Sequence, residues 1–192
     1  MSVTPAEQAQ IGVSGGGLLP VGVAGGPPFA QTFDRRFATS TVFAPTTQVL
    51  TMTAIWLAAG QVVNGISFCS GSTAESGGSH LWFALYQSNL TFMAQGADET
   101  GTGAFAVNSM HRQALTSPQT CPYTGLYYLG FLAVGTMPTL INTTVATVNA
   151  TGNIAGMTPI LAATSTGSLG ASAPSPAGAL TAITQALWAC VD

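Results

Sequence analysis

The side chains that could do acid–base or nucleophilic chemistry are few in this sequence and lie far apart. His80 is in an aromatic stretch, His111 is beside Arg112, and Asp98 and Glu99 are the only adjacent acids. A hydrolase needs a nucleophile with a base, or two carboxylates, gathered in one pocket. Neighbouring side chains on a strand point to opposite faces. We therefore predict no catalytic residues and no enzyme activity, with both histidines hydrogen-bonded in strands and the two acids solvating a loop or capping a backbone group.

The cysteines do not form a recognisable metal or disulfide pattern. Cys69, Cys121 and Cys190 are odd in number, far apart and without a CxxC motif. We predict three small buried hydrophobic residues, and the alternative is one disulfide with a spare thiol. The acids also lack the DxDxDG spacing of a calcium loop, so no metal or cofactor is expected.

Charged residues are depleted throughout the chain. They make up 5% of it, against a usual fraction of about 25%, and the basic ones are three arginines and no lysine. Nucleic-acid binding and charge-driven membrane attachment both require several basic side chains, so neither is expected. No apolar run reaches the about 20 residues of a membrane-spanning helix, and the first residues lack the basic region of a secretory signal. With so few charges, much of the exterior is expected to be covered by neighbouring subunits.

The chain divides into a Gly- and Pro-rich arm, residues 1–39, and a β-rich domain, residues 40–192. Short runs rich in Thr, Val, Ile and aromatic residues predict an all-β fold, an antiparallel sandwich or jelly roll with an extended N-terminal arm. The strands are expected at residues 47–54, 62–68, 80–86, 90–97, 111–115, 126–134 and 139–149, with a weaker candidate at 154–161. The end of the chain fits either a helix or a closing strand at residues 186–191, and the strand is favoured.

Two predicted strands, residues 80–86 and 126–134, are apolar on both faces. One face of each fits a sandwich core, and the other fits a second layer or a subunit interface. Trp82 and Tyr128 are the aromatic residues that would face a glycan, if one is bound.

The junction between arm and domain holds the only cluster of charges, Asp34, Arg35 and Arg36. A solvated junction or an internal salt bridge is one reading. The other is that Arg35 or Arg36, with Phe29 and Phe33 beside them, contacts a neighbouring protein, because arginine suits interface contacts.

Two stretches, SHLWFALYQSNLTFMAQGADET and QALTSPQTCPYTGLYYLGFLAVGTMPTL, resemble a β-sandwich module in virion proteins of tailed bacteriophages that infect actinobacteria. The resemblance covers residues 47–140 and includes no active-site motif. It implies a subunit of the virion that coats, braces or projects from the particle. The chain lacks a collagen-like repeat or coiled-coil stalk, which favours a capsid decoration or minor capsid protein over a fibre.

The partners implied by this resemblance are the major capsid protein or other virion proteins, and further copies of the chain, with a trimer favoured. The alternative is a minor tail or fibre-type module that recognises host surface glycans. The first reading requires docking surfaces on the arm and the strand faces, whereas the second requires exposed aromatic rings.

Overall fold

The computed structural model describes residues 30–100, 105–144, 160–165 and 167–192. Phe29, the rest of the arm before it, and residues 145–159 lie outside this part of the chain. The described residues form antiparallel strands and one short 3-10 helix, η1. Their bounds are β1 Ala30–Gln31, η1 Arg35–Phe37, β2 Thr39–Phe43, β3 Thr51–Leu57, β4 Val62–Cys69, β5 Ser76–Gln87, β6 Phe92–Gln95, β7 Met110–Thr120, β8 Gly125–Thr136, β9 Leu140–Thr144, β10 Ala162–Thr164, β11 Thr181–Ala182, β12 Gln185–Leu187 and β13 Ala189–Val191.

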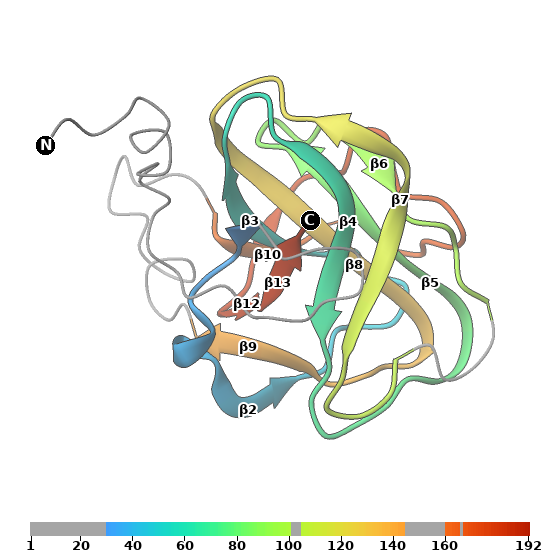
Figure 1. The fold of residues 1–192 in the computed structure, drawn as a ribbon. Helices are drawn as coiled ribbons and strands as arrows, with labels where there is room; N and C mark the ends of the chain where they lie inside the picture. The colour runs from blue at the N-terminus through green and yellow to red at the C-terminus, as the bar shows by residue number, and fades with distance from the viewer. Residues whose placement is uncertain (1–29, 101–104, 145–159, 166) are drawn as a thin grey trace, which may run out of the picture.

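Three antiparallel sheets pack as a sandwich, which confirms the predicted all-β class. A six-stranded sheet, in the order β11-β10-β3-β8-β5-β6, faces a four-stranded sheet, β1-β13-β4-β7. Figure 1 shows β4 and β7 in front of β8 and β5, with β2 and β9 below them. A bridge between Gly96 and Leu115 joins the two large sheets along one side. The third sheet, β12-β9-β2, closes one end. The jelly-roll form of the prediction stays a prediction.

The inner face of the six-stranded sheet is buried against the four-stranded sheet. Phe83 on β5 and Phe131 on β8 are both fully buried there and meet Phe68 of β4 edge to face, at centroid distances of 4.9 and 5.5 Å. Such aromatic pairs contribute about 0.5–1.5 kcal/mol beyond the area that they bury. The period of two along β5 and β8 therefore places the phenylalanines in one apolar core.

The outer face of the same sheet is covered by residues 167–180, which we call the covering segment. Leu169, Ala173, Ala177 and Leu180 pack there against an apolar cluster that includes Trp82. The Trp82 indole donates a 2.7 Å hydrogen bond to the Gly170 carbonyl. Of the two alternatives for the second apolar face, the structure shows the second layer, and the chain supplies it from its own C-terminal region.

This cover overturns the prediction that Trp82 and Tyr128 face a glycan. Trp82 is 0% and Tyr128 2% exposed. The Tyr128 hydroxyl donates to the Ile160 carbonyl at 2.8 Å. Both rings lie on the covered face of the sheet, so neither can stack on a sugar.

The strands predicted between residues 47 and 134 are confirmed in place, with several ends moved, and the one predicted at 139–149 is confirmed over the described residues 140–144. The weaker candidate at 154–161 is not confirmed, because residues 154–159 lie outside the described residues and 160–161 are not in a strand. The hairpin of β5 and β6 turns through residues 88–90, and Leu90 has the left-handed φ of 69° that such a turn requires. β7 runs through Pro118 to Thr120, past the predicted end at residue 115. Since β7 is at the edge of its sheet, the missing N–H of Pro118 leaves no partner unpaired. The C-terminal segment forms β12 and β13, as the favoured alternative predicted.

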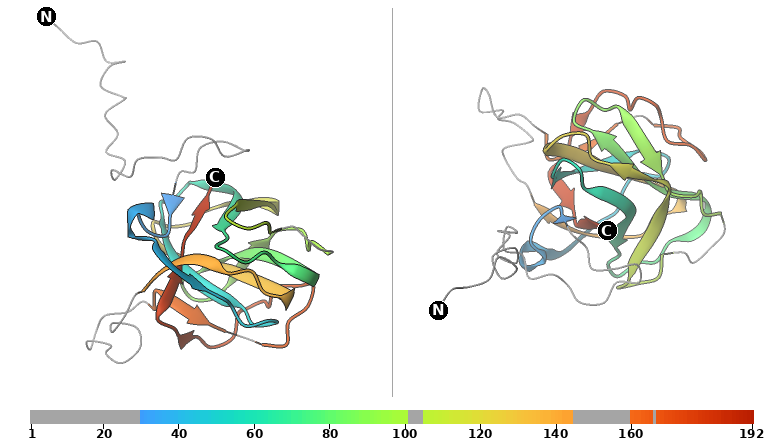
Figure 2. Two further views of the ribbon diagram at one scale, coloured as in Figure 1. Left: turned by 90° about the horizontal axis from the view of Figure 1, so that it is seen from below. Right: turned by 45° about the horizontal axis from the view of Figure 1, so that its top comes forward.

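The arm also ends earlier than predicted. From Ala30 the chain belongs to the sandwich, because β1 pairs with β13 and the Thr32 hydroxyl donates to the Leu187 carbonyl at 2.9 Å. Figure 2 shows the chain's C-terminal end next to β4, where β13 pairs with that strand. The boundary set at residue 39 therefore falls within the folded domain, and the described part of the predicted arm is a strand and η1.

Candidate docking groove

The three charged residues at 34–36 have different contacts in η1: Asp34 and Arg36 bind each other, and Arg35 does not take part. The Asp34 side chain caps this helix by accepting a 2.9 Å hydrogen bond from the Arg36 amide, and it binds the Arg36 guanidinium at 3.0–3.1 Å. These hydrogen bonds hold the pKa of the Asp34 carboxyl below its ordinary value. Arg36 therefore forms the internal salt bridge of the first reading, and its contact with a neighbouring protein stays a prediction.

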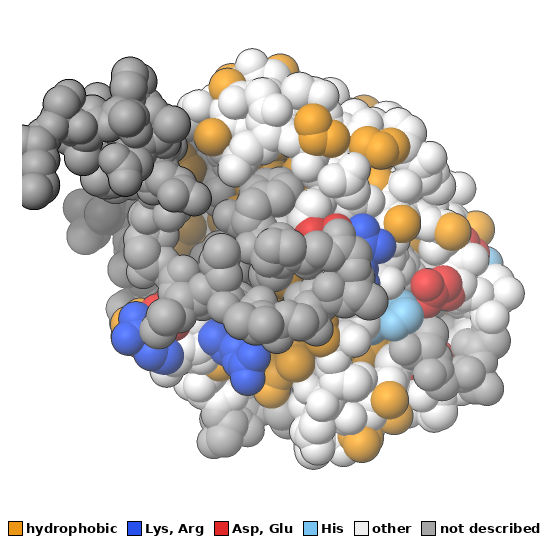
Figure 3. Space-filling view, in the orientation of Figure 1, with side chains coloured by type: hydrophobic (Ala, Val, Ile, Leu, Met, Phe, Trp, Pro, Cys, Tyr) orange, Lys and Arg blue, Asp and Glu red, His pale blue; other side chains and the backbone are white. Residues whose placement is uncertain are grey.

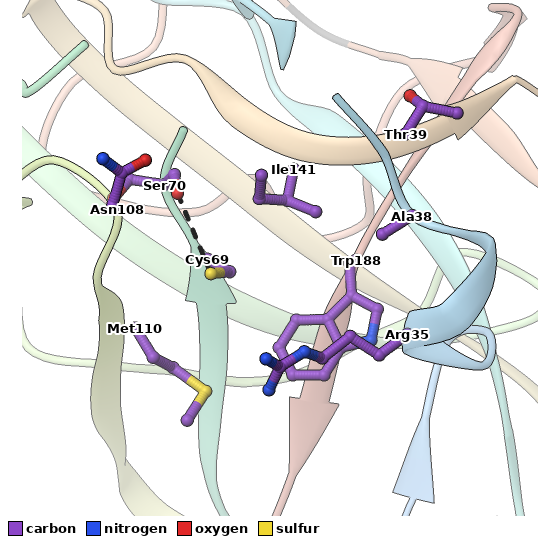
Figure 4. Close-up of a pocket in the computed structure, with 9 residues that line it drawn as sticks. All are labelled: Arg35, Ala38, Thr39, Cys69, Ser70, Asn108, Met110, Ile141 and Trp188. Carbon is purple, nitrogen blue, oxygen red and sulfur yellow. Dashed lines mark hydrogen bonds between the residues drawn. The ribbon is translucent and has the colours of Figure 1, made fainter. Parts of the chain in front are cut away.

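Arg35 instead lines a cavity of about 450 Å³, which we call the groove. The groove is bounded by η1, the beginning of β2, the end of β4, the beginning of β7, β9 and Trp188. Figure 4 shows these side chains around the cavity. They are Arg35, Ala38, Thr39, Cys69, Ser70, Asn108, Met110, Ile141 and Trp188.

The wall formed by the end of β4 and the loop before β7 is held by backbone hydrogen bonds, from the Ser70 amide to the Ser109 carbonyl and from the Asn108 amide to the Gly71 carbonyl, and by the Ser70 hydroxyl. Ser70 Oγ donates to the Ala106 carbonyl at 2.5 Å and accepts from the Ser109 amide at 3.0 Å. Asn108 lies between them with a φ of 48°, in the left-handed region that asparagine tolerates better than most residues. The wall is thus built from backbone that is already hydrogen-bonded, and its shape does not depend on a ligand.

Trp188 forms the opposite wall and carries an unused donor. Trp188 connects β12 to β13, and its backbone N–H donates a 2.9 Å hydrogen bond to the Ile141 carbonyl of β9. The residue is 2% exposed, yet Nε1 has no acceptor among the described residues. A buried donor without a partner costs about 1–3 kcal/mol. A ligand that brings an oxygen to this nitrogen recovers that free energy.

The side chains that line the groove are suited to binding a ligand. Cys69 is half-buried, and burial raises the pKa of its thiol while the charge of Arg35 lowers it to a smaller extent. The neutral thiol is a weak nucleophile, and no His, Asp or Glu lines the groove among the described residues. One guanidinium, one indole donor and an apolar floor suit a short peptide segment that carries an acid.

The histidines and the adjacent acids form two structural pairs away from the groove. His80 Nδ1 lies 2.7 Å from Asp98 Oδ2, and His111 Nε2 lies 2.7 Å from Glu99 Oε2. Asp98 also accepts a hydrogen bond from the Leu81 amide, so the predicted backbone cap is confirmed. The pairs tie residues 98–99 to β5 and β7, and both histidines are hydrogen-bonded strand residues as predicted.

The cysteines are all free thiols, and two of the three are buried. The alternative of one disulfide is therefore wrong. Across the ranges that the structure describes, no group of three or more His, Cys, Asp or Glu side chains could hold a metal ion. Within the same ranges no helix is long and apolar enough to cross a membrane.

Sequence reasoning found part of the groove. Arg35 was named as an interface residue and lines it, whereas Phe33 is half-buried outside it. Trp188, Asn108 and Met110 were missed, because they come from segments far apart in the chain and no spacing links them. Comparison with protein-family models and with curated proteins finds no match to this chain.

Proposed function

We propose that this chain is a structural protein of a bacteriophage virion, a capsid decoration or minor capsid subunit. It binds and stabilises the head surface through its N-terminal arm and β-sandwich, as one copy of a homo-oligomer. The observation that supports this role is how little charge the surface offers. Figure 3 shows a face on which charged side chains are few and lie in small groups.

Ion pairs within the chain take up most of these charges. Arg36 binds Asp34, and Arg112 binds Asp192 at 2.7 Å. What the surface offers instead is uncharged polar groups and exposed apolar side chains. Six large apolar side chains of the described residues are more than a third exposed: Phe37 67%, Trp56 66%, Val62 44%, Val107 50%, Met110 37% and Leu161 39%. Centres of protein interfaces are poor in charge and rich in aromatic residues and Met, so this surface suits protein partners.

The experiment is to locate and count the protein in intact virions. Immunogold electron microscopy assigns it to head or tail, and quantitative mass spectrometry gives its ratio to the major capsid protein. We expect head labelling and a fixed ratio. Absence from purified virions would refute the proposal.

Substitutions at the exposed aromatic residues then test which surface docks. Trp56→Ser and Phe37→Ser each remove a ring that the fold does not need, so the domain should still fold. At least one of them should lower the number of copies per virion. Ser72→Ala, at another exposed position, is the matched control and should leave the ratio unchanged.

The structure also sets where the arm should be cut. Because β1 and η1 belong to the sandwich, a deletion should end at residue 29 rather than remove them. We expect the β domain to stay folded after this deletion and its incorporation into particles to be abolished. Normal incorporation would show that the arm plays no part in docking.

The alternative, a minor tail or fibre-type module for host glycans, now depends on aromatic residues that are exposed, Trp56 first among them. Trp56 is exposed, but its register partner on β8 is Leu126, and polar groups are needed beside a sugar-stacking ring. Binding of host cell-wall glycans that is lost in Trp56→Ala would favour this alternative. Tail labelling in the electron microscope would do so independently.

A further inference from the structure

The ion pairs among the described residues leave one arginine, Arg35, without a carboxylate partner. Arg35 has no carboxylate within 4 Å among the described residues, although every other charged group near it is paired. Four ion pairs join the described side chains: Arg36 with Asp34, His80 with Asp98, His111 with Glu99, and Arg112 with Asp192.

The acids of the sequence leave one candidate partner for Arg35. Glu75 is 3% exposed and lies beside Gly78 at the beginning of β5, outside the groove. Glu7 is the only acid that lies outside the described residues, and it is the only charged side chain in residues 1–29. Residues 101–104 and 145–159 contain no acid, so neither segment can neutralise Arg35.

The groove presents a second group that a peptide would satisfy. Trp188 Nε1 is a donor without an acceptor among the described residues, and a peptide brings one carbonyl oxygen with every residue. A volume of about 450 Å³ lies within the range of sites that bind small ligands and short segments. Arg35 and Trp188 line the same cavity (Figure 4), so one segment can reach both.

We propose that the groove binds the N-terminal arm of its own chain, with the Glu7 carboxylate on the Arg35 guanidinium and a backbone carbonyl of the arm on Trp188 Nε1. This contact is separate from the proposed virion role and does not depend on it. It makes the groove an internal docking site that the arm fills in the free subunit.

Chain connectivity favours the arm of the same chain over that of a second copy. Ala30 is held on β13, five residues before Arg35. The 23 residues from Glu7 to Ala30 span at most about 80 Å, far more than the return to the groove requires. A tethered segment acts at an effective concentration on the order of millimolar. A second copy at micromolar concentration would have to bind about a thousandfold more tightly to compete.

A natural thiol in the groove provides the test. Cys69 lines the groove, whereas Cys121 and Cys190 are buried and should not react. Gln8→Cys places a thiol next to Glu7 and keeps the carboxylate. When the full-length variant is oxidised with diamide, we expect a disulfide between positions 8 and 69 within one chain. Peptide mass mapping identifies it, and its rate of formation should not depend on protein concentration.

Matched variants separate docking from random collision. Ser14→Cys lies seven residues from Glu7 and should cross-link at least several-fold more slowly. Adding Arg35→Met to Gln8→Cys should slow cross-linking about tenfold, the factor that corresponds to one charge-assisted hydrogen bond. Arg36→Met should leave the rate unchanged, because Arg36 is bound to Asp34.

Three results would overturn the proposal: equal rates for Gln8→Cys and Ser14→Cys, no effect of Arg35→Met, or a disulfide-linked dimer, which would assign the groove to a second copy. If Arg35→Met alters folding, as circular dichroism would reveal, Glu7→Gln removes the same ion pair from the arm side. Loss of virion incorporation with normal cross-linking would refute only the virion role.

Discussion

Both faces of the six-stranded sheet are covered over its central strands, but different kinds of side chain are buried there. The inner face meets another sheet and is lined by phenylalanines, including Phe83 and Phe131. The outer face meets the irregular covering segment and is lined by Trp82, Tyr86 and Tyr128. Trp82 and Tyr86 donate to the Gly170 and Pro174 carbonyls of that segment at 2.7 and 3.1 Å.

The difference follows from what each cover does with its own backbone. The strands of a sheet pair their carbonyls with each other, so a purely apolar ring can pack on them. An irregular segment leaves carbonyls unpaired, and buried carbonyls need donors. Aromatic residues with a polar end supply both the apolar area and the donor. On the outer face, Trp82, Tyr86 and Tyr128 donate to the Gly170, Pro174 and Ile160 carbonyls in this way.

The largest effect is expected on the inner face. Phe83→Ala removes a fully buried ring that contacts Phe68, Phe105 and Phe131, and it should lower the free energy of unfolding by about 3–5 kcal/mol. Urea denaturation measures the change. Phe37→Ala, the same substitution at a residue 67% exposed, is the control and should change stability by less than about 0.5 kcal/mol. Equal effects would contradict the assignment of the core.

A smaller effect is expected where the C-terminus closes the four-stranded sheet. Arg112 lies across Gly65 and binds the buried Asp192 carboxylate through two hydrogen bonds of 2.7 and 2.8 Å. Arg112→Met leaves that carboxylate without its cation and should destabilise the fold by about 1.5–3 kcal/mol. Thermal and urea denaturation measure it.

Gly65 offers a second way to break the same contact. A methyl group there would lie 2.6 Å from the Arg112 guanidinium, so Gly65→Ala should displace it and lower stability as well. Arg36→Met is the control, because the Arg36–Asp34 pair is exposed and its loss should change little. If the Arg112→Met variant is as stable as the wild type, the Asp192 carboxylate is hydrated in place of its contact with Arg112.

A substitution on the outer face should loosen only the covering segment, residues 167–180. Tyr86→Phe removes only the hydroxyl that binds the Pro174 carbonyl, and about 0.5–1.5 kcal/mol should be lost. Hydrogen exchange should rise in residues 167–180 while the inner strands stay protected. Tyr127→Phe is the matched control, because the Tyr127 hydroxyl binds the Tyr123 carbonyl instead. Exchange that rises equally in both variants would show that the covering segment does not depend on its aromatic donors.

The sequence predicted what depends on local pattern. The period of two in residues 80–86 and 126–134 revealed the strands and their two apolar faces, since alternation is a property of the strand itself. It did not reveal what covers the outer face, because residues 167–180 have no period and their role depends on contacts with strands about 90 residues away. Trp82 was misassigned for this reason.

The same limit applies to the groove. Arg35 stood out because arginine is scarce here, whereas Trp188 gives no local sign that its Nε1 lacks an acceptor. A cavity assembled from the ends of separate elements has no spacing in the sequence. Composition pointed to the right arginine, and only the fold showed what lies beside it.

Labelling the cysteines with iodoacetamide compares the buried interior with the groove and requires no substitution. Burial raises the pKa of Cys190 to about 11 and also raises that of Cys121. The thiolate is the reactive form, so a raised pKa lowers its population at pH 8. Together with steric protection, this should keep both residues unlabelled by iodoacetamide until the protein unfolds. Burial also raises the pKa of Cys69, but this residue is only half-buried and should be labelled before the other two, as mass spectrometry of peptides would show. Early labelling of Cys121 would place an opening in the inner core, because that residue packs within it.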